Sequence, residues 1–384
     1  MPISLPSFPV RRLVLLRFTR GAPAGDPLPD APDIDERGYR PPFEGPMASL
    51  AAGATAQVGL QRFLLETRTP LFVESSEPSV VRIVDPASGA LPSDESMTIR
   101  FTGVDGGTDR RSAVIRVRLG TSTGPVAQEL HVVVFRPVSV RVTPHLITVN
   151  STSAAGTPPI ADVPAIMRKV ADIWTVAGVN FTVLPTRVQT FTFKAVNLVD
   201  AATLPGELGP LLANRMPDGT PNWVPNTINV YFVVQISGPI VLGFGFSRTS
   251  FASLGLPNPG IILADRSPFG PRSGVMHFAQ TLAHEFGHFF TLAHAGGAQI
   301  PNEREDTSSR RMLMQNFNPL RGKDPFPAND SKGNPFTQRP RFDDIGYGNL
   351  AAGCLITLKD LPQFTGDGEC FTARAAITTP PGPF

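Results

Sequence analysis

The sequence His284-Glu285-Phe286-Gly287-His288, which continues as Phe289-Phe290-Thr291-Leu292-Ala293-His294, determines how the rest of the chain is interpreted. Two His residues at positions i and i+4 of a helix lie on one face, so both imidazoles can reach a single cation while Glu285 lies beside it. The large apolar residues of this stretch make it suitable for burial. We therefore predict a buried helix that carries a metal site, with His284 and His288 as ligands.

A third histidine follows the second within the same stretch. If the helix continued, His294 would lie about 240° around the axis from His288 and would face away from the metal. The stretch resembles the pattern HExxHxxGxxH of the metzincin clan of zinc endopeptidases, in which a Gly ends the helix at that point. The resemblance implies that His284, His288 and His294 bind Zn²⁺ and that Glu285 is the general base. Thr291 stands at the Gly position, where a left-handed Thr costs on the order of 1 kcal/mol, so a differently made turn is the alternative.

Metzincins also have a methionine-containing turn beneath the metal, downstream of the third His. The segment Arg311-Met312-Leu313-Met314-Gln315 stands where the resemblance requires this turn, and Met314 is its predicted methionine because a Leu precedes it, as is common in the family. The alternative is that Met314 fills a gap in a core, as methionine often does. No Tyr stands just after this methionine, where Asn316 and Phe317 are found instead, so no phenol is predicted to stabilise an oxyanion.

The resemblance implies an enzyme that hydrolyses peptide bonds in proteins. Three neutral imidazoles would hold one Zn²⁺ and leave the fourth position to water, which Glu285 would activate for attack on the scissile carbonyl. Two alternatives stay open. One is a gluzincin-type metallopeptidase, whose third ligand would be a downstream glutamate such as Glu303, and the other is a catalytically silent immunoglobulin-like binding or adhesion protein. The presence of Glu285 argues against the silent protein, because a structural zinc site needs no general base.

Composition limits the other function classes. The chain has 384 residues, with 41 Pro and 35 Gly, so it is long enough for two domains and rich in turns. A net charge of +2 gives no reason to expect nucleic acid as a partner. We expect a protein or peptide substrate and a monomer. A structural Ca²⁺ ion stays open but has no supporting motif.

The cysteines and the N-terminal sequence indicate whether the protein is exported or stays in the cytoplasm. Cys354 and Cys370 are the only cysteines, and they form a disulfide if the protein is exported or remain free thiols if it is not. The apolar run near the N-terminus is interrupted by Arg11, Arg12 and Arg17, which is too much charge for an ordinary signal peptide. No apolar tract is long enough to predict a membrane span. We expect a secreted or extracellular bacterial protein without a recognisable signal peptide, with the cytoplasm as the alternative.

The N-terminal third is predicted to contain an arm and a β-sandwich. Residues 1–45 are rich in Pro, Gly and Asp, which favours a mobile arm that buries little apolar surface. Residues 46–137 contain short alternating apolar runs separated by turn residues, which indicates an antiparallel sandwich. The segment VESSEPSVVRIV at residues 73–84 resembles bacterial immunoglobulin-like domains, which implies a spacer without chemistry. The predicted strands are Leu71–Val73, Val80–Val84, Met97–Phe101, Ala113–Leu119 and Leu130–Phe135.

Residues 138–384 are predicted to form an α+β metzincin-like catalytic domain, with an upper subdomain over 138–294 and an irregular lower subdomain over 295–384. Asp162 is predicted to cap a helix whose apolar residues recur at three- and four-residue steps until Gly178 ends it. Predicted strands of this domain are Val140–Val149, Asn180–Leu184, Phe191–Leu198, Ile228–Ile236 and Gly260–Ala264.

The last of these strands has a predicted role in substrate binding. In metzincins, the last sheet strand before the zinc helix is an edge that pairs with extended substrate. The resemblance therefore implies a peptide-binding edge formed by Gly260, Ile261, Ile262, Leu263 and Ala264. The expected fold class is thus multidomain, with an all-β immunoglobulin-like sandwich followed by an α+β metzincin-like zinc peptidase domain.

Overall fold

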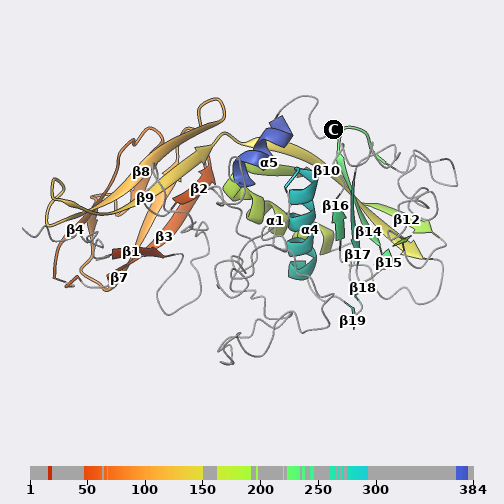
Figure 1. Cartoon of the computed structure of the whole chain (residues 1–384), viewed down its shortest axis with the longest axis horizontal. Coiled ribbons are helices and arrows are strands. Elements are labelled where there is room, and N and C mark those ends of the chain that lie inside the picture. Colours follow the sequence, from red (N-terminus) through yellow and green to blue (C-terminus); the bar gives the residue numbers. More distant parts are fainter. Residues whose placement is uncertain are drawn as a thin grey trace, which may run out of the picture.

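The computed structural model consists of a β-sandwich followed by a mixed β-sheet that packs against helices (Figure 1). It describes residues 16–19, 47–62, 65–66, 68–149, 162–191, 196–197, 219, 223–233, 236–237, 243–245, 260–264, 266–267, 270–271, 275–292 and 369–378. No helix among these residues has the length and apolar character needed to cross a membrane.

The sandwich has two sheets that enclose one hydrophobic core. The four-stranded sheet has the order β1-β3-β7-β5 and is antiparallel, and the five-stranded sheet has the order β2-β9-β8-β4-β6, in which β2 runs parallel to β9. The predicted sandwich is therefore confirmed. Its strands are β1 (Leu16–Thr19), β2 (Met47–Ala51), β3 (Thr55–Arg62), β4 (Leu71–Ser75), β5 (Val81–Asp85), β6 (Ala90–Leu91), β7 (Ser96–Gly103), β8 (Arg110–Leu119) and β9 (Val126–Phe135).

Strand β1 corrects the prediction of an arm over residues 1–45. It pairs antiparallel with β3, and its alternate side chains, Leu16 and Phe18, are buried in the sandwich core. Arg17 between them points to the other face, as the alternation of a strand requires. The arginine that made this run unsuitable as a signal peptide is thus compatible with an edge strand that is buried on one face only.

The second sheet begins directly after the sandwich. Strand β9 ends at Phe135, and only Arg136 and Pro137 separate it from β10 (Val138–Val149). Val133 and Phe135 of β9 pack in the core of the second unit. The chain therefore passes from one core into the next without a long linker.

The second sheet has the order β11-β10-β14-β17-β16, with β12 also paired to β10. Its pairs are parallel except for β16, which runs antiparallel to β17. The strands are β11 (Val179–Val183), β12 (Arg187–Phe191), β14 (Ile228–Val233), β16 (Gly243–Gly245) and β17 (Gly260–Ala264). Two-residue strands form two further small pairs: β13 (Val196–Asn197) with β15 (Ile236–Ser237), and β18 (Arg266–Ser267) with β19 (Gly270–Pro271).

The first helix follows the predicted apolar periodicity. Helix α1 (Val163–Trp174) continues as the 3₁₀ turn η2 (Thr175–Ala177) and ends at Gly178, whose left-handed φ of 65° confirms the predicted stop. A Cβ on Gly178 would lie 2.6 Å from the Cβ of Phe135, so this turn also requires glycine for space. Asp162 stands at the N-cap position, but its side chain makes no capping hydrogen bond, so that part of the prediction is wrong.

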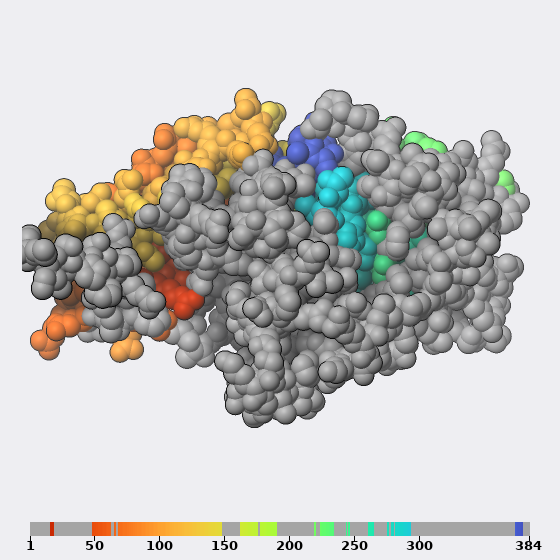
Figure 2. All heavy atoms as spheres, in the orientation of Figure 1, coloured from red at the N-terminus to blue at the C-terminus, as the bar shows by residue number. Residues whose placement is uncertain are grey.

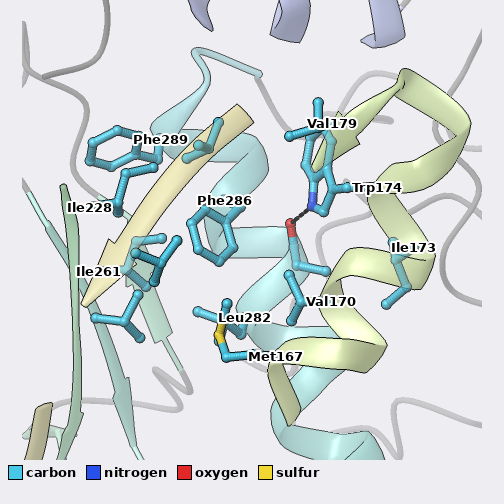
Figure 3. Close-up of a cluster of buried hydrophobic side chains, with 14 of the residues drawn as sticks. Met167, Val170, Ile173, Trp174, Val179, Ile228, Ile261, Leu282, Phe286 and Phe289 are labelled. Atoms are coloured by element: carbon cyan, nitrogen blue, oxygen red, sulfur yellow. Dashed lines mark hydrogen bonds between the residues drawn. The ribbon is translucent and has the colours of Figure 1, made fainter. Parts of the chain in front are cut away.

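Helix α1 packs beside helix α4 (Val275–Phe289), and both cover one face of the sheet (Figure 1). The Trp174 indole N–H donates to the Ala283 carbonyl at 3.2 Å, which links the two helices within their shared core (Figure 3). The Trp174 ring also lies edge-on to Phe290, with ring centroids 5.1 Å apart. The position of α4 is therefore fixed by burial along its length and by one buried hydrogen bond.

The opposite face of the same sheet carries a buried polar network. His145 Nε2 and the Asn229 Oδ1 are 2.9 Å apart, and the Gln189 amide nitrogen lies 2.9 Å from His145 Nδ1. The His145 ring stacks on Tyr231 with centroids 4.5 Å apart. Because the Gln189 amide nitrogen can only donate, Nδ1 is the acceptor and the N–H of His145 is on Nε2. This network joins β10, β12 and β14.

The C-terminal helix α5 (Glu369–Thr378) lies between the sandwich and helices of the second unit (Figures 1 and 2). Its Arg374 is only 2% exposed and bonds the Asp109 carboxylate of the sandwich at 2.7 and 3.1 Å. The same guanidinium donates to the Ala177 carbonyl at 2.9 Å and lies over the Phe135 ring, 4.7 Å from its centroid. One side chain thus contacts both units and their junction.

Candidate active site

Helix α4 has two faces with different compositions. Its core face consists of apolar residues at helical spacing, namely Phe278, Ala279, Leu282, Ala283, Phe286 and Phe289, all of them buried. The Phe286 ring packs against Phe181 at 4.8 Å between centroids. A second stripe carries Thr281, His284, Glu285 and His288, which recur at three- and four-residue steps. Burial of the apolar face therefore sets the direction in which this polar stripe points.

The two histidines of the stripe lie next to each other. Their ring centroids are 4.8 Å apart and their planes are nearly perpendicular. His288 Nδ1 is 2.9 Å from the Leu292 carbonyl oxygen, and because a carbonyl only accepts, Nδ1 carries the proton. The lone pair of His288 is therefore on Nε2, which is the arrangement that metal-binding histidines have when their other nitrogen donates to a carbonyl.

Burial lowers the pKa of His288 below its ordinary value, and the hydrogen bond to Leu292 partly opposes that shift. The neutral imidazole is the form that binds a metal. Both the tautomer and the charge of His288 are thus suited to a cation ligand. These properties, together with the neighbouring imidazole of His284, fit Zn²⁺, which nitrogen donors of this kind commonly hold.

The helix ends just after His288. The Thr291 N–H donates to the His288 carbonyl and the Leu292 N–H to the Gly287 carbonyl, each at 2.9 Å. These are the two bonds of a Schellman motif, in which the residue after the C-cap is left-handed. Thr291 is that residue, with φ 68°. Of the two turns considered from the sequence, the left-handed turn at Thr291 itself is therefore the one that forms.

Glu285 is buried, with 6% of its surface exposed, and it lies against the strand β16. A Cβ on Gly243 would be 2.7 Å from both Cγ and Oε1 of Glu285. A Cβ on Gly245 would be 2.3 Å from the Glu285 carbonyl oxygen and 3.2 Å from the His288 Cβ. The two alternate glycines thus allow the backbone of β16 to lie directly on the polar stripe of α4.

The strand predicted as the peptide-binding edge is not an edge. Gly260 to Ala264 form β17, which pairs with β14 on one side and β16 on the other, and all five residues are buried. In the described sheet the outermost strand on this side is β16, which also is its antiparallel member. The sequence prediction missed β16 because three residues give no periodic pattern. The alternation Gly243-Phe244-Gly245 was its available signal, since glycine within a strand often marks close approach of another backbone.

Several predicted site residues lie outside the described part of the chain. These are His294, Met314, Cys354 and the alternative ligand Glu303; Cys370 is in α5, where only its backbone is described. Among the described residues, no three His, Cys, Asp or Glu side chains form a group that could hold a metal. The structure therefore brings together two of the three predicted ligands, His284 and His288, with the predicted base Glu285 between them in sequence.

No protein-family model matches the chain, and no curated protein matches it. Among the solved structures that match, the following three show only limited similarity. WR4, a C. elegans MSP family member, is 13% identical, with 23% of this chain and 91% of that chain covered and a TM-score of 0.18. A sialyltransferase from Photobacterium damsela is 9% identical (49% and 35% covered, TM-score 0.19), and the teleost fish polymeric Ig receptor ectodomain is 10% identical (27% and 55% covered, TM-score 0.17). At these scores, none of the three bears on the fold or the function.

Proposed function

We propose that the chain is a zinc-dependent endopeptidase of the metzincin type. The observation that carries this proposal is the end of α4, where the left-handed residue Thr291 stands at the Gly position of the pattern HExxHxxGxxH. A helix that continued past this point would turn His294 away from His288. A chain reversal three residues after His288 instead favours a third ligand that follows closely in sequence.

The metal would be held by His284 and His288, with His294 as the third ligand that the motif implies. Zn²⁺, when bound, supplies a Lewis acid that lowers the pKa of water and polarises a carbonyl group. The bond from His288 Nδ1 to the Leu292 carbonyl fixes the orientation of its ring, because the imidazole cannot rotate without losing that buried partner.

Glu285 is the proposed general base. Its carboxylate would take a proton from the attacking water and deliver that proton to the amine that leaves when the C–N bond breaks. It comes from the same polar stripe as the two histidines, one residue after the first, so the helix itself sets the distance between base and ligands. Its burial restricts the carboxylate to few orientations, which favours efficient proton transfer.

The proposed substrate is a protein segment in extended conformation that adds to the sheet at β16. An edge strand presents backbone N–H and C=O groups with which an extended peptide can pair. The position of β16 supports this assignment, because its glycines lie on Glu285 and next to His288. A peptide paired to β16 would therefore pass the proposed base, and the role first assigned to residues 260–264 passes to residues 243–245.

The test compares the zinc-loaded protein with its Glu285→Gln variant on a denatured protein mixture, with the products read by mass spectrometry. We expect cuts by the wild type and a rate lower by about 10²-fold or more in the variant, since a general base contributes about that much. Both proteins should bind one equivalent of zinc, because Glu285 is not a proposed ligand. Equal cleavage by both proteins, or none by a wild type that holds zinc, would contradict the proposal.

A pair of substitutions separates the metzincin from the gluzincin interpretation. The early end of α4 favours His294 over Glu303 as third ligand, so His294→Ala should lose zinc affinity while Glu303→Ala should retain it. The opposite result would assign the site to the gluzincin type. Zinc affinity measured by competition with a chelating dye answers this question independently of any activity.

A further inference from the structure

Gly243 lies on the edge strand β16, next to α4 (Figure 1). The three nearest atoms that a Cβ would meet there are Cγ, Oε1 and Cδ of Glu285, at 2.7, 2.7 and 2.9 Å. The Glu285 side chain therefore occupies the space that a side chain of residue 243 would need. Among the described glycines, Gly243 is the one whose missing Cβ would meet this carboxylate.

The neighbouring glycine makes a different contact. A Cβ on Gly245 would be 2.3 Å from the carbonyl oxygen of Glu285, which is part of the helix backbone. Residues 243 and 245 pair with Leu263 and Ile261, whose side chains are in the core beside α4, so both glycines face the helix. The missing Cβ of Gly245 thus allows the strand to approach the helix backbone, whereas the missing Cβ of Gly243 leaves room for the carboxylate.

We infer that Gly243 is a positioning residue for Glu285. The missing side chain at this position leaves the space that the Glu285 carboxylate occupies, so the carboxylate lies directly against the backbone of β16. The inference rests on the proposed function, in which Glu285 is the base. It adds that the placement of this base depends on β16 as well as on the helix, whereas the ring of His288 is oriented by the Leu292 carbonyl just beyond the end of the helix.

The two glycines give a matched pair of variants. In Gly243→Ala the three nearest atoms to the new methyl group are side-chain atoms of Glu285, so the fold should persist while the carboxylate moves. In Gly245→Ala the methyl group meets helix backbone, so strand and helix must separate and the protein should lose thermal stability. This contrast separates a displaced carboxylate from a damaged fold.

The decisive experiment is a double-mutant cycle with Gly243→Ala and Glu285→Gln, with kcat and KM measured on a peptide that the wild type cleaves. We expect kcat of Gly243→Ala to fall about 10- to 100-fold, since a misplacement near 1 Å costs about that much, with zinc affinity unchanged. In the Glu285→Gln background, the added Gly243→Ala change should alter kcat by less than about twofold, because the base that Gly243 positions is already absent.

Two results would overturn the inference while leaving the proposed function intact. One is a Gly243→Ala variant with the kcat of the wild type; if its KM rises, Gly243 would be assigned to substrate binding instead. The other is an equal loss of kcat with and without Glu285. A zinc-loaded wild type without any activity would instead refute the proposed function itself, and with it the base that Gly243 is inferred to position.

Discussion

At the scale of single residues, Thr291 stands where the pattern HExxHxxGxxH has a Gly, and it has a left-handed backbone conformation. A β-branched residue with φ 68° is strained, because its Cβ crowds the neighbouring backbone. We expect Thr291→Gly to raise the free energy of unfolding by about 1 kcal/mol, which is the usual cost of a left-handed non-glycine residue. Urea unfolding followed by tryptophan fluorescence measures this, since Trp174 and Trp223, the only two tryptophans, both lie in the second unit.

The control for this prediction is Thr291→Ala, which removes the branched side chain but keeps a Cβ. Because Thr291 is exposed, loss of its methyl and hydroxyl groups should change stability little. Thr291→Gly should therefore be clearly more stable than Thr291→Ala. Equal stability of the two variants would mean that the left-handed turn carries no strain that glycine relieves.

The same residue shows what the sequence could predict about the site. The spacing of His284, Glu285 and His288 is local, so helix geometry alone places them on one stripe, and the structure has them there. The sequence left two turns open at Thr291, because the choice depends on the tertiary burial of Phe290 and Leu292, which offsets the cost of a left-handed Thr. Contact between Gly243 and Glu285 could not be predicted, since it depends on pairing between segments distant in sequence.

At the scale of elements, some of the predicted strands alternate strongly between buried and less buried residues, whereas the predicted strands β14 and β17 are buried throughout. Residues of β7 and β8 alternate between more and less buried along their length, and both strands were predicted. Strands β1 and β16 have four and three residues, too few to show a period, but β2 and the eight-residue β3 were missed as well. The pairing of β16 on the outer side of β17 joins segments distant in sequence, which the sequence pattern does not reveal. The edge was therefore assigned to β17 instead of β16.

At the scale of elements, the buried polar network around His145 predicts that the free energy of unfolding depends on pH. Burial lowers the pKa of His145 to about 4 from its ordinary value of 6.5, although the bond to Asn229 partly opposes the shift. As the pH decreases, His145 is protonated near pH 6.5 in the unfolded chain but only near pH 4 in the folded protein. The free energy of unfolding should therefore fall as the pH decreases from 6.5 and should level off near 4. The full loss from this residue is about 3 kcal/mol, since one pKa unit corresponds to about 1.4 kcal/mol.

A comparison with His145→Asn isolates this contribution from that of other groups. The variant loses bonds between β10, β12 and β14, so it should be less stable at neutral pH. Its stability should nevertheless depend less on pH between 6.5 and 4 than that of the wild type, with both proteins free of zinc. Parallel pH dependences of the two proteins would refute the assignment of this proton uptake to His145.

At the scale of the whole molecule, the sandwich is joined to the second unit by more than the chain connection. Phe135 of β9 is in the second core, and Arg374 of α5 bonds Asp109 while it lies over that same Phe135 ring. A guanidinium suits this position because its several N–H groups can bond a carboxylate and a carbonyl at once. The sandwich, which was expected to be a spacer, thus packs closely against the second unit, and the two should unfold together.

The final prediction tests this coupling with Arg374→Met, which keeps much of the apolar stem but removes the charge. The Ala177 carbonyl would lose a buried donor, whereas the Asp109 carboxylate, whose side chain is 54% exposed, can regain water. We therefore expect a loss of about 2 kcal/mol, below that for a fully buried pair. Calorimetry should show one transition for the wild type and two for Arg374→Met.

The control is Arg116→Met, which breaks the partly exposed pair with Glu129 inside the sandwich. This variant should still unfold in one transition, and its free energy of unfolding should be within about 0.5 kcal/mol of the wild type. A single transition in Arg374→Met would mean that the packing of Phe135 suffices to couple the two units.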